Sequence, residues 1–248
     1  MQTIANYQMS VFGNFDSIVP EIGLMNELTK TPVELKLLPN TVNVIALDIP
    51  PENGVISGQP KVLQRIQMVE TTQRWNIVIM PDRIDVNFNQ PISDSPLELN
   101  QISELAFGLL NHTVTVCKET YRRIAINLAI KRETDSINKL SSFHNELTEP
   151  FNFQRQSASI EWRVMSNNPT EFYLSTGSIE RINVICSISG QMEQTSEYSL
   201  FTHLDINTVP FNINPRFSTE DLEAFKNKAV ELITEIKAEI EEKWNNVK

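Results

Sequence analysis

Glycine, histidine and cysteine are scarce in this chain of 248 residues, which contains 7, 3 and 2 of them. No two glycines stand in the spacing of a GxGxxG or GxxxxGK[ST] loop, so the backbone amides that cradle phosphates in nucleotide-binding proteins are missing. Cys117 and Cys186 form no CxxC pair, and no histidine stands in an HExxH or HxxxH pattern. The sequence therefore predicts neither a cofactor nor a metal ion, and we expect two buried thiols.

Long apolar runs and basic charge are also lacking. The longest uninterrupted apolar run, 105–110, is far shorter than the roughly 20 residues that a membrane-spanning helix needs. No Lys or Arg precedes Lys30, so the basic segment of a signal peptide is missing, and we expect a cytoplasmic protein outside the membrane. The net charge of −10 disfavours general binding to the phosphate backbone of nucleic acids.

The remaining composition, 40% hydrophobic and 21% charged, is typical of a globular protein. Runs of consecutive strand-like segments predict an α+β fold with mostly antiparallel sheet, because parallel sheets alternate strands with helices. Pro39-Asn40 and Gly190-Gln191 are expected to form turns between strands. The candidate strands are 33–38, 42–49, 62–71, 75–80, 84–88, 121–131, 158–165, 171–175, 178–189 and 197–207.

Two long helices are expected. Ser95-Pro96-Leu97-Glu98 combines a capping residue, a proline suited to the first turn and the glutamate of a capping box, and predicts a mid-chain helix to about 118. Ser218 and Asp221 form a variant of the same box, and the apolar residues after them recur every three or four positions to Val247. This pattern predicts a long amphipathic C-terminal helix. Shorter helices are expected at 19–29 and 134–147.

The two halves of the chain share the same loose order, in which several strands precede a long helix. No sequence repeat accompanies that order. We expect an N-terminal unit, 1–132, built of a β-meander and a helix, and a C-terminal unit, 133–248, built of antiparallel sheet and the long helix. One continuous domain is the alternative.

One pair of side chains has the residue types of a catalytic or metal-binding site. On a strand, residues two apart share a face, so His203 and Asp205 are expected side by side as a base or metal ligand with its orienting acid. The pair supports a hypothesis of metal-dependent hydrolysis, completed by carboxylates from elsewhere. The competing interpretation is a half-exposed polar strand face.

A second alternative is nucleic-acid binding. Five basic residues and one acidic residue lie between 118 and 132, and Tyr121 could stack on a base. The basic residues are Lys118, Arg122, Arg123, Lys131 and Arg132. The competing interpretation is a polar strand face balanced by acidic neighbours.

The leading hypothesis is a non-catalytic protein that binds a protein partner or a second copy of itself. The surface would be a sheet edge or the C-terminal helix, whose long apolar stripe must pack on a sheet, another helix or a partner. The expected contact residues are Leu232, Ile236, Ile240 and Trp244.

Three features together resemble an uncharacterised, sporadically distributed bacterial family of about this length. They are the Asp82-Arg83-Ile84 strand after 75–80, the Arg123–Asn127 strand after a capped helix, and an acidic helix closing the chain after Leu204-Asp205-Ile206. The resemblance implies no established activity, so it transfers no catalytic residue.

Overall fold

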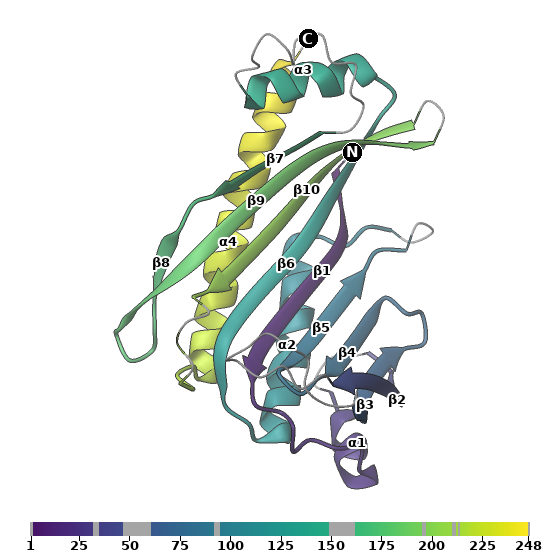
Figure 1. The fold of residues 1–248 in the computed structure, drawn as a ribbon, viewed down its shortest axis with the longest axis vertical. Helices are drawn as coiled ribbons and strands as arrows, with labels where there is room; N and C mark the ends of the chain where they lie inside the picture. The colour runs from purple at the N-terminus through teal and green to yellow at the C-terminus, as the bar shows by residue number, and fades with distance from the viewer. Residues whose placement is uncertain are drawn as a thin grey trace.

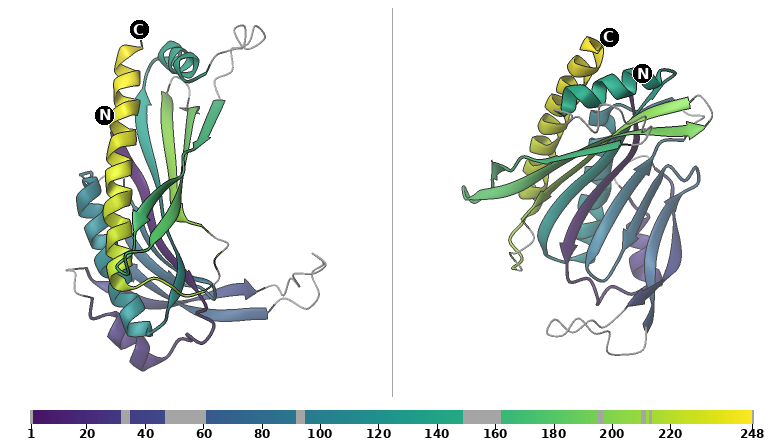
Figure 2. Two further views of the ribbon diagram at one scale, coloured as in Figure 1. Left: turned by 90° about the vertical axis from the view of Figure 1, so that its left-hand side faces the viewer. Right: turned by 45° about the horizontal axis from the view of Figure 1, so that its top comes forward.

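The computed structural model describes residues 2–31, 35–46, 61–91, 95–148, 162–194, 197–209, 212 and 214–247. In these residues, ten strands form one antiparallel sheet that curves strongly, and four helices accompany it (Figure 1). The two long helices lie on the same side of the sheet (Figure 2). The expected α+β class, with an antiparallel sheet, a capped mid-chain helix and a long C-terminal helix, is confirmed.

In chain order the elements are β1 (Gln2–Gly13), α1 (Ile22–Leu28), β2 (Leu37–Ala46), β3 (Lys61–Glu70), β4 (Trp75–Ile79), β5 (Arg83–Asn89), α2 (Leu99–Cys117), β6 (Tyr121–Thr134), α3 (Ile137–Leu147), β7 (Trp162–Asn167), β8 (Thr170–Tyr173), β9 (Ile179–Gln194), β10 (Glu197–Thr208) and α4 (Thr219–Asn246). The strands pair in the order β2-β3-β4-β5-β1-β6-β10-β9-β7, and β8 also pairs with β9.

The chain order repeats, since a strand, a short helix, four strands and a long helix occur twice in succession. The two central strands, β1 and β6, join the repeats. Met9 stands opposite Val86, as Ile126 stands opposite Ile206, and Met9 and Ile126 stand opposite each other. The register therefore relates the halves by an approximate two-fold axis between Met9 and Ile126.

The register also reveals an alignment of β5 and α2 with β10 and α4 at a constant offset of 120 positions, whereas Met9 of β1 and Ile126 of β6 are 117 positions apart. Ile84-Asp85-Val86-Asn87 of β5 matches Leu204-Asp205-Ile206-Asn207 of β10, and α2 begins at Leu99 where α4 begins at Thr219. The match is short and conservative, which explains why a search for repeated sequence alone does not find it. The outer strands are less alike, because β7 and β8 both pair with β9, whereas β2 pairs only with β3.

The buried side chains form two cores. The larger core lies between α1, α2, the first two-thirds of α4 and the central sheet. The smaller core lies at the far end of α4, where Phe143 of α3 packs edge-on against Trp244, with ring centroids 5.2 Å apart. Its other buried members are Leu140, Ile188, Leu200, Ile240 and Val247.

The C-terminal helix begins as expected, but the mid-chain helix does not. Asp221 accepts the Ser218 amide and the Asp221 amide binds Ser218 Oγ, as in the expected capping box. The mid-chain helix begins at Leu99, not near Ser95, because Glu98 is its cap and Gln101 completes the box. The expectation of a cap at Ser95 was wrong by one turn.

Two expected turns are also wrong. β2 runs through Pro39-Asn40, and a proline is tolerated there because β2 is an edge strand of the sheet. Gly190 lies within β9 opposite Trp162, and a Cβ atom at Gly190 would approach Trp162 Nε1 to 2.6 Å. The glycine therefore makes room for the indole instead of forming a turn. Parts of three expected strands, 33–34, 47–49 and 158–161, lie outside the described residues.

Within the described part of the chain, no helix combines the length and apolar composition required to cross a membrane.

Candidate functional site

His203 and Asp205 lie on the open face of the sheet, turned away from α2 and α4. The imidazole stacks near Phe201, with ring centroids 6.0 Å apart, and Asp205 Oδ1 accepts a hydrogen bond from Asn207 Nδ2 at 2.9 Å. Burial, and secondly the charge of Arg163, lower the pKa of His203 below its ordinary value. Among the described residues, no group of three or more His, Cys, Asp or Glu side chains is placed to hold a metal ion.

The basic residues between 118 and 132 do not form one surface. Strand alternation puts Arg123 and Lys131 on the open face, where Arg123 lies over the Phe12 ring at 4.6 Å. Arg132 points to the opposite side and pairs with Glu241 of α4. Arg122 is an even number of residues from Arg132 on β6 and so lies on the same face of the strand. Lys118 is the C-terminal cap of α2, with a φ of 55°. No continuous strip for a phosphate backbone results.

Charges on the open face are also compensated in place. Asp85 accepts from Arg83 Nε at 2.8 Å and from Ser10 Oγ at 2.7 Å, and Lys131 lies 3.1 Å from Glu133. Counterion release needs free basic groups, so these pairs weaken the argument for nucleic-acid binding.

The four residues expected to make contacts on α4 divide into two pairs. Ile240 and Trp244 are only 5% and 4% exposed, because they belong to the smaller core. Leu232 and Ile236, two turns and one turn before Ile240, are partly buried and line a groove. The apolar stripe of α4 is therefore covered at its end and open in its middle.

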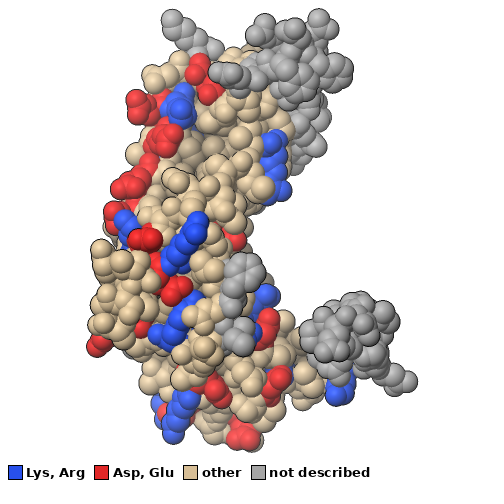
Figure 3. All heavy atoms as spheres, turned by 60° about the vertical axis from the view of Figure 1, so that its left-hand side comes forward, with Lys and Arg blue, Asp and Glu red and all other residues tan. Residues whose placement is uncertain are grey.

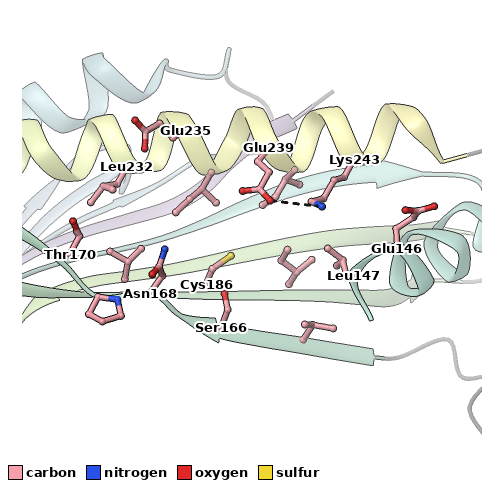
Figure 4. A pocket seen from close by; sticks show the side chains of 16 residues that line it. Glu146, Leu147, Ser166, Asn168, Thr170, Cys186, Leu232, Glu235, Glu239 and Lys243 are labelled. Atoms are coloured by element: carbon pink, nitrogen blue, oxygen red, sulfur yellow. Dashed lines mark ion pairs between the residues drawn. The ribbon is translucent and has the colours of Figure 1, made fainter. Parts of the chain in front are cut away.

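The groove runs between α4 and the strands β7, β8 and β9, and α3 lies at one of its ends (Figure 4). Its volume is about 580 Å³. It lies where the two cores adjoin, because Cys186 and Ile236 pack against both. The apolar side chains that line it are Leu147, Val164, Val184, Cys186, Ile188, Leu232, Ile236 and Ile240.

The rim of the groove is mainly acidic. Glu235 and Glu239 of α4 and Glu146 of α3 line it, and all three are exposed. Among the described residues that line it, Lys243 is the only basic one, and its Nζ lies 3.9 Å from Glu239 Oε1 (Figure 4). The charge extends along α4, which carries eight acidic and four basic residues, and acidic side chains gather along that border in Figure 3.

Cys186 is the most reactive type of side chain in the groove. Burial, and secondly the charge of Glu239, raise its pKa to about 11. The side chain is therefore a neutral thiol near pH 7, whereas nucleophilic cysteines have lowered pKa values. The arrangement is suited to binding an apolar surface and not to nucleophilic attack.

Comparisons with models of protein families, with curated proteins and with solved structures gave no match to this chain. The resemblance to an uncharacterised bacterial family stays a prediction. The groove must therefore be interpreted from its own geometry.

The sequence singled out the α4 wall of the groove but not its floor. Val184 and Cys186 follow the alternation of an ordinary buried strand, and Ser166 and Asn168 resemble edge-strand residues. A gap between a strand and a helix depends on where α3 packs, and no local pattern in the sequence encodes that position.

Proposed function

We propose that this protein is a non-catalytic binding protein that docks a polypeptide partner in the groove beside α4. The observation that supports it is the open middle of the apolar stripe, where Leu232 and Ile236 face a groove between two closed cores. Interfaces of this kind place apolar anchors in a pocket surrounded by polar residues. The exposed glutamates of the rim fit that arrangement.

The chemistry of the described side chains favours binding over catalysis. His203 and Asp205 lie on the opposite face from the groove and have no further metal ligand beside them. The thiol of Cys186 is held neutral by burial. Hydrolysis would need a general base or a metal beside the bound substrate. His203 does line a separate hollow with Arg163 and Gln191, but no group of three His, Cys, Asp or Glu side chains among the described residues could hold a metal ion there. Location in the cytoplasm remains an expectation of the same proposal.

Photo-crosslinking from single positions on α4 tests the proposal. A benzophenone amino acid at Glu235, on the rim, should capture one defined protein in cells of the native host. The same group at Thr234, which is exposed on the opposite side of the helix, should not. The captured protein is then purified and its affinity for the intact chain is measured by calorimetry.

The matched variants are Ile236→Glu in the groove and Thr234→Glu outside it. Loss of affinity in the first and retention in the second would support groove docking. Equal capture from both positions, or an affinity that Ile236→Glu leaves unchanged, would refute it. Circular dichroism and unfolding curves of both variants exclude misfolding as the cause of any loss.

A further inference from the structure

Resting on the proposed function, we infer that the occupant of the groove is an amphipathic helix whose apolar face is flanked by Lys or Arg residues. The inference comes from the other half of the molecule, where the equivalent surface is already covered. Its charge requirement comes from the rim of the groove.

In the N-terminal half, a helix lies where the groove would be. α1 packs against α2, and His112 Nε2 of α2 lies 3.2 Å from the carbonyl oxygen of Glu27 at the end of α1. Leu28, the last residue of α1, is completely buried in the larger core. A short helix with an apolar face therefore closes the space beside α2.

In the C-terminal half, the corresponding helix is displaced. The offset of 120 places Leu232 of α4 where α2 has His112, and Leu232 lines the groove. α3, which occupies the position of α1 in the chain order, instead packs on Trp244. Twelve residues separate Leu232 from Trp244, which is about 18 Å along a helix. The site that α1 fills in one half is thus left open in the other.

The floors of the two sites correspond as well. Val184 and Cys186 of β9 stand opposite Ile206 and Leu204, as Ile77 and Ile79 of β4 stand opposite Val86 and Ile84. Ile77 and Ile79 are 1% and 0% exposed beneath α1. In the groove, Val184 is also buried, at 5% exposed, and the difference lies at Cys186, which is only partly buried. An apolar helix placed in the groove would complete the burial that the first half already has.

Charge decides which helix fits. Glu235 and Glu239 line the α4 side of the groove and Glu146 lies at its α3 end, so a helix with basic flanks gains attraction and one with acidic flanks is repelled. The chain's own α1 is bordered by Glu21 and Glu27, and α4 is acidic along its length. These charges argue against a second copy of this chain and for a different, basic polypeptide.

Synthetic peptides of about 15 residues test the inference, since shorter helices are marginal in water. The first has leucines three and four apart with lysines beside them, the second has the same composition in scrambled order, and the third has glutamates in place of the lysines. By fluorescence anisotropy, we expect the first to bind at least about tenfold more tightly than either control.

A charge reversal provides the matched test. The double variant Glu146→Lys and Glu235→Lys, which leaves the Glu239–Lys243 pair intact, should bind the glutamate peptide better than the lysine peptide. Thr234→Lys, on the opposite side of α4, should leave the original preference unchanged. An unchanged preference in the double variant would overturn the charge requirement.

The remaining outcomes separate this inference from the proposed function. Equal binding of the scrambled peptide would refute a helical occupant. If no peptide binds but the crosslink at Glu235 persists, the partner is not a basic helix and groove docking survives. If sedimentation shows a dimer that Leu232→Glu dissociates, the occupant is a second copy and the inference is wrong.

Discussion

The N-terminal and C-terminal halves share one order of elements and differ in what covers the sheet beside the long helix. In the first half, α1 and the segment before it close a single core, in which Ile66, Met68, Ile77 and Ile79 are all at most 1% exposed. In the second half, two cores lie at either end of a groove. The same topology therefore supports a closed surface and an open one.

Element length accounts for the difference. α4 has 28 residues and α2 has 19, while β9 has 16 and β4 has five. On the longer α4, α3 packs at the far end, where it builds the smaller core, and the middle of the helix stays uncovered. The residue beside the floor strand is also more polar in the second half. Met68 stands opposite Ile77 in the first half, whereas in the second half the backbone amide of Asn168 donates to the carbonyl oxygen of Val184.

The largest expected difference between the halves concerns leucine truncation. Leu28→Ala removes a completely buried anchor of α1 and should lower the free energy of unfolding by about 2–5 kcal/mol. Leu232→Ala, at the partly exposed groove wall, should cost less than about 1 kcal/mol because little apolar surface is lost from the interior. Urea unfolding of both variants checks the contrast, and equal costs would show that the groove is closed.

The caps of the two long helices give the next largest contrast. The buried Asp221 carboxylate accepts the Ser175 amide at 2.6 Å and the amide and hydroxyl of Ser218 at 2.7 and 2.8 Å. Its counterpart Gln101 accepts only the Glu98 amide among the contacts described, at 3.1 Å. Asp221→Asn should therefore cost about 1.5–3 kcal/mol, and Gln101→Ala about 1 kcal/mol or less.

The cap of α4 also predicts a pH dependence. Burial opposes ionisation of Asp221, but the hydrogen bonds from Ser175 and Ser218 outweigh it and lower the pKa of the carboxyl. A lowered pKa stabilises the fold above the unfolded-state value of about 3.9, and this stabilisation is lost as the pH falls through the folded-state value. The stability gap between wild type and Asp221→Asn should thus narrow below about pH 4, and a constant gap would contradict the assignment.

Local sequence patterns predicted most elements because each carries its own periodicity or cap. The Ser218 box and the alternation of Ile84, Val86 and Phe88 need no knowledge of the rest of the chain. Pro39 and Gly190 do not form the predicted turns, because their roles depend on neighbours distant in sequence: the edge position of β2 in one case, and the indole of Trp162 in the other.

The candidate site was harder to predict, because it depends on a comparison between halves. Leu232 and Trp244 belong to the same amphipathic stripe, and only the packing of α3 leaves one open and covers the other. The match of Asp85-Val86-Asn87 to Asp205-Ile206-Asn207 is the signal in the sequence that could have aligned the halves. Without the sheet register it is too short to stand out.

Gly190→Ala probes the core that only the second half possesses. The added Cβ would lie 2.6 and 2.8 Å from Nε1 and Cε2 of Trp162, so the indole must move from its place beside Phe143. Overpacking of this kind should cost about 1–3 kcal/mol. Near-ultraviolet circular dichroism should report the displaced indole. A variant with wild-type stability and spectrum would show that this core is loosely packed.

The two cysteines give the smallest contrast and report directly on how open each half is. Burial raises the pKa of Cys186 to about 11 and that of Cys117, in the last turn of α2, to about 12, with smaller contributions from Glu239 and Glu119. Alkylation requires the thiolate, so both rates should rise about tenfold per pH unit below these values. Cys186, with the lower pKa, should react faster than Cys117 below about pH 11.

Mass spectrometry of the Cys117→Ser and Cys186→Ser variants separates the two rates. The lysine-flanked peptide should slow alkylation of Cys186 in the groove and leave Cys117 unaffected, because only the second half has a vacant site. Protection of both thiols would mean that the peptide stabilises the whole fold without occupying the groove. Protection of neither would place its binding site elsewhere, and the contrast between the halves would then have no bearing on recognition.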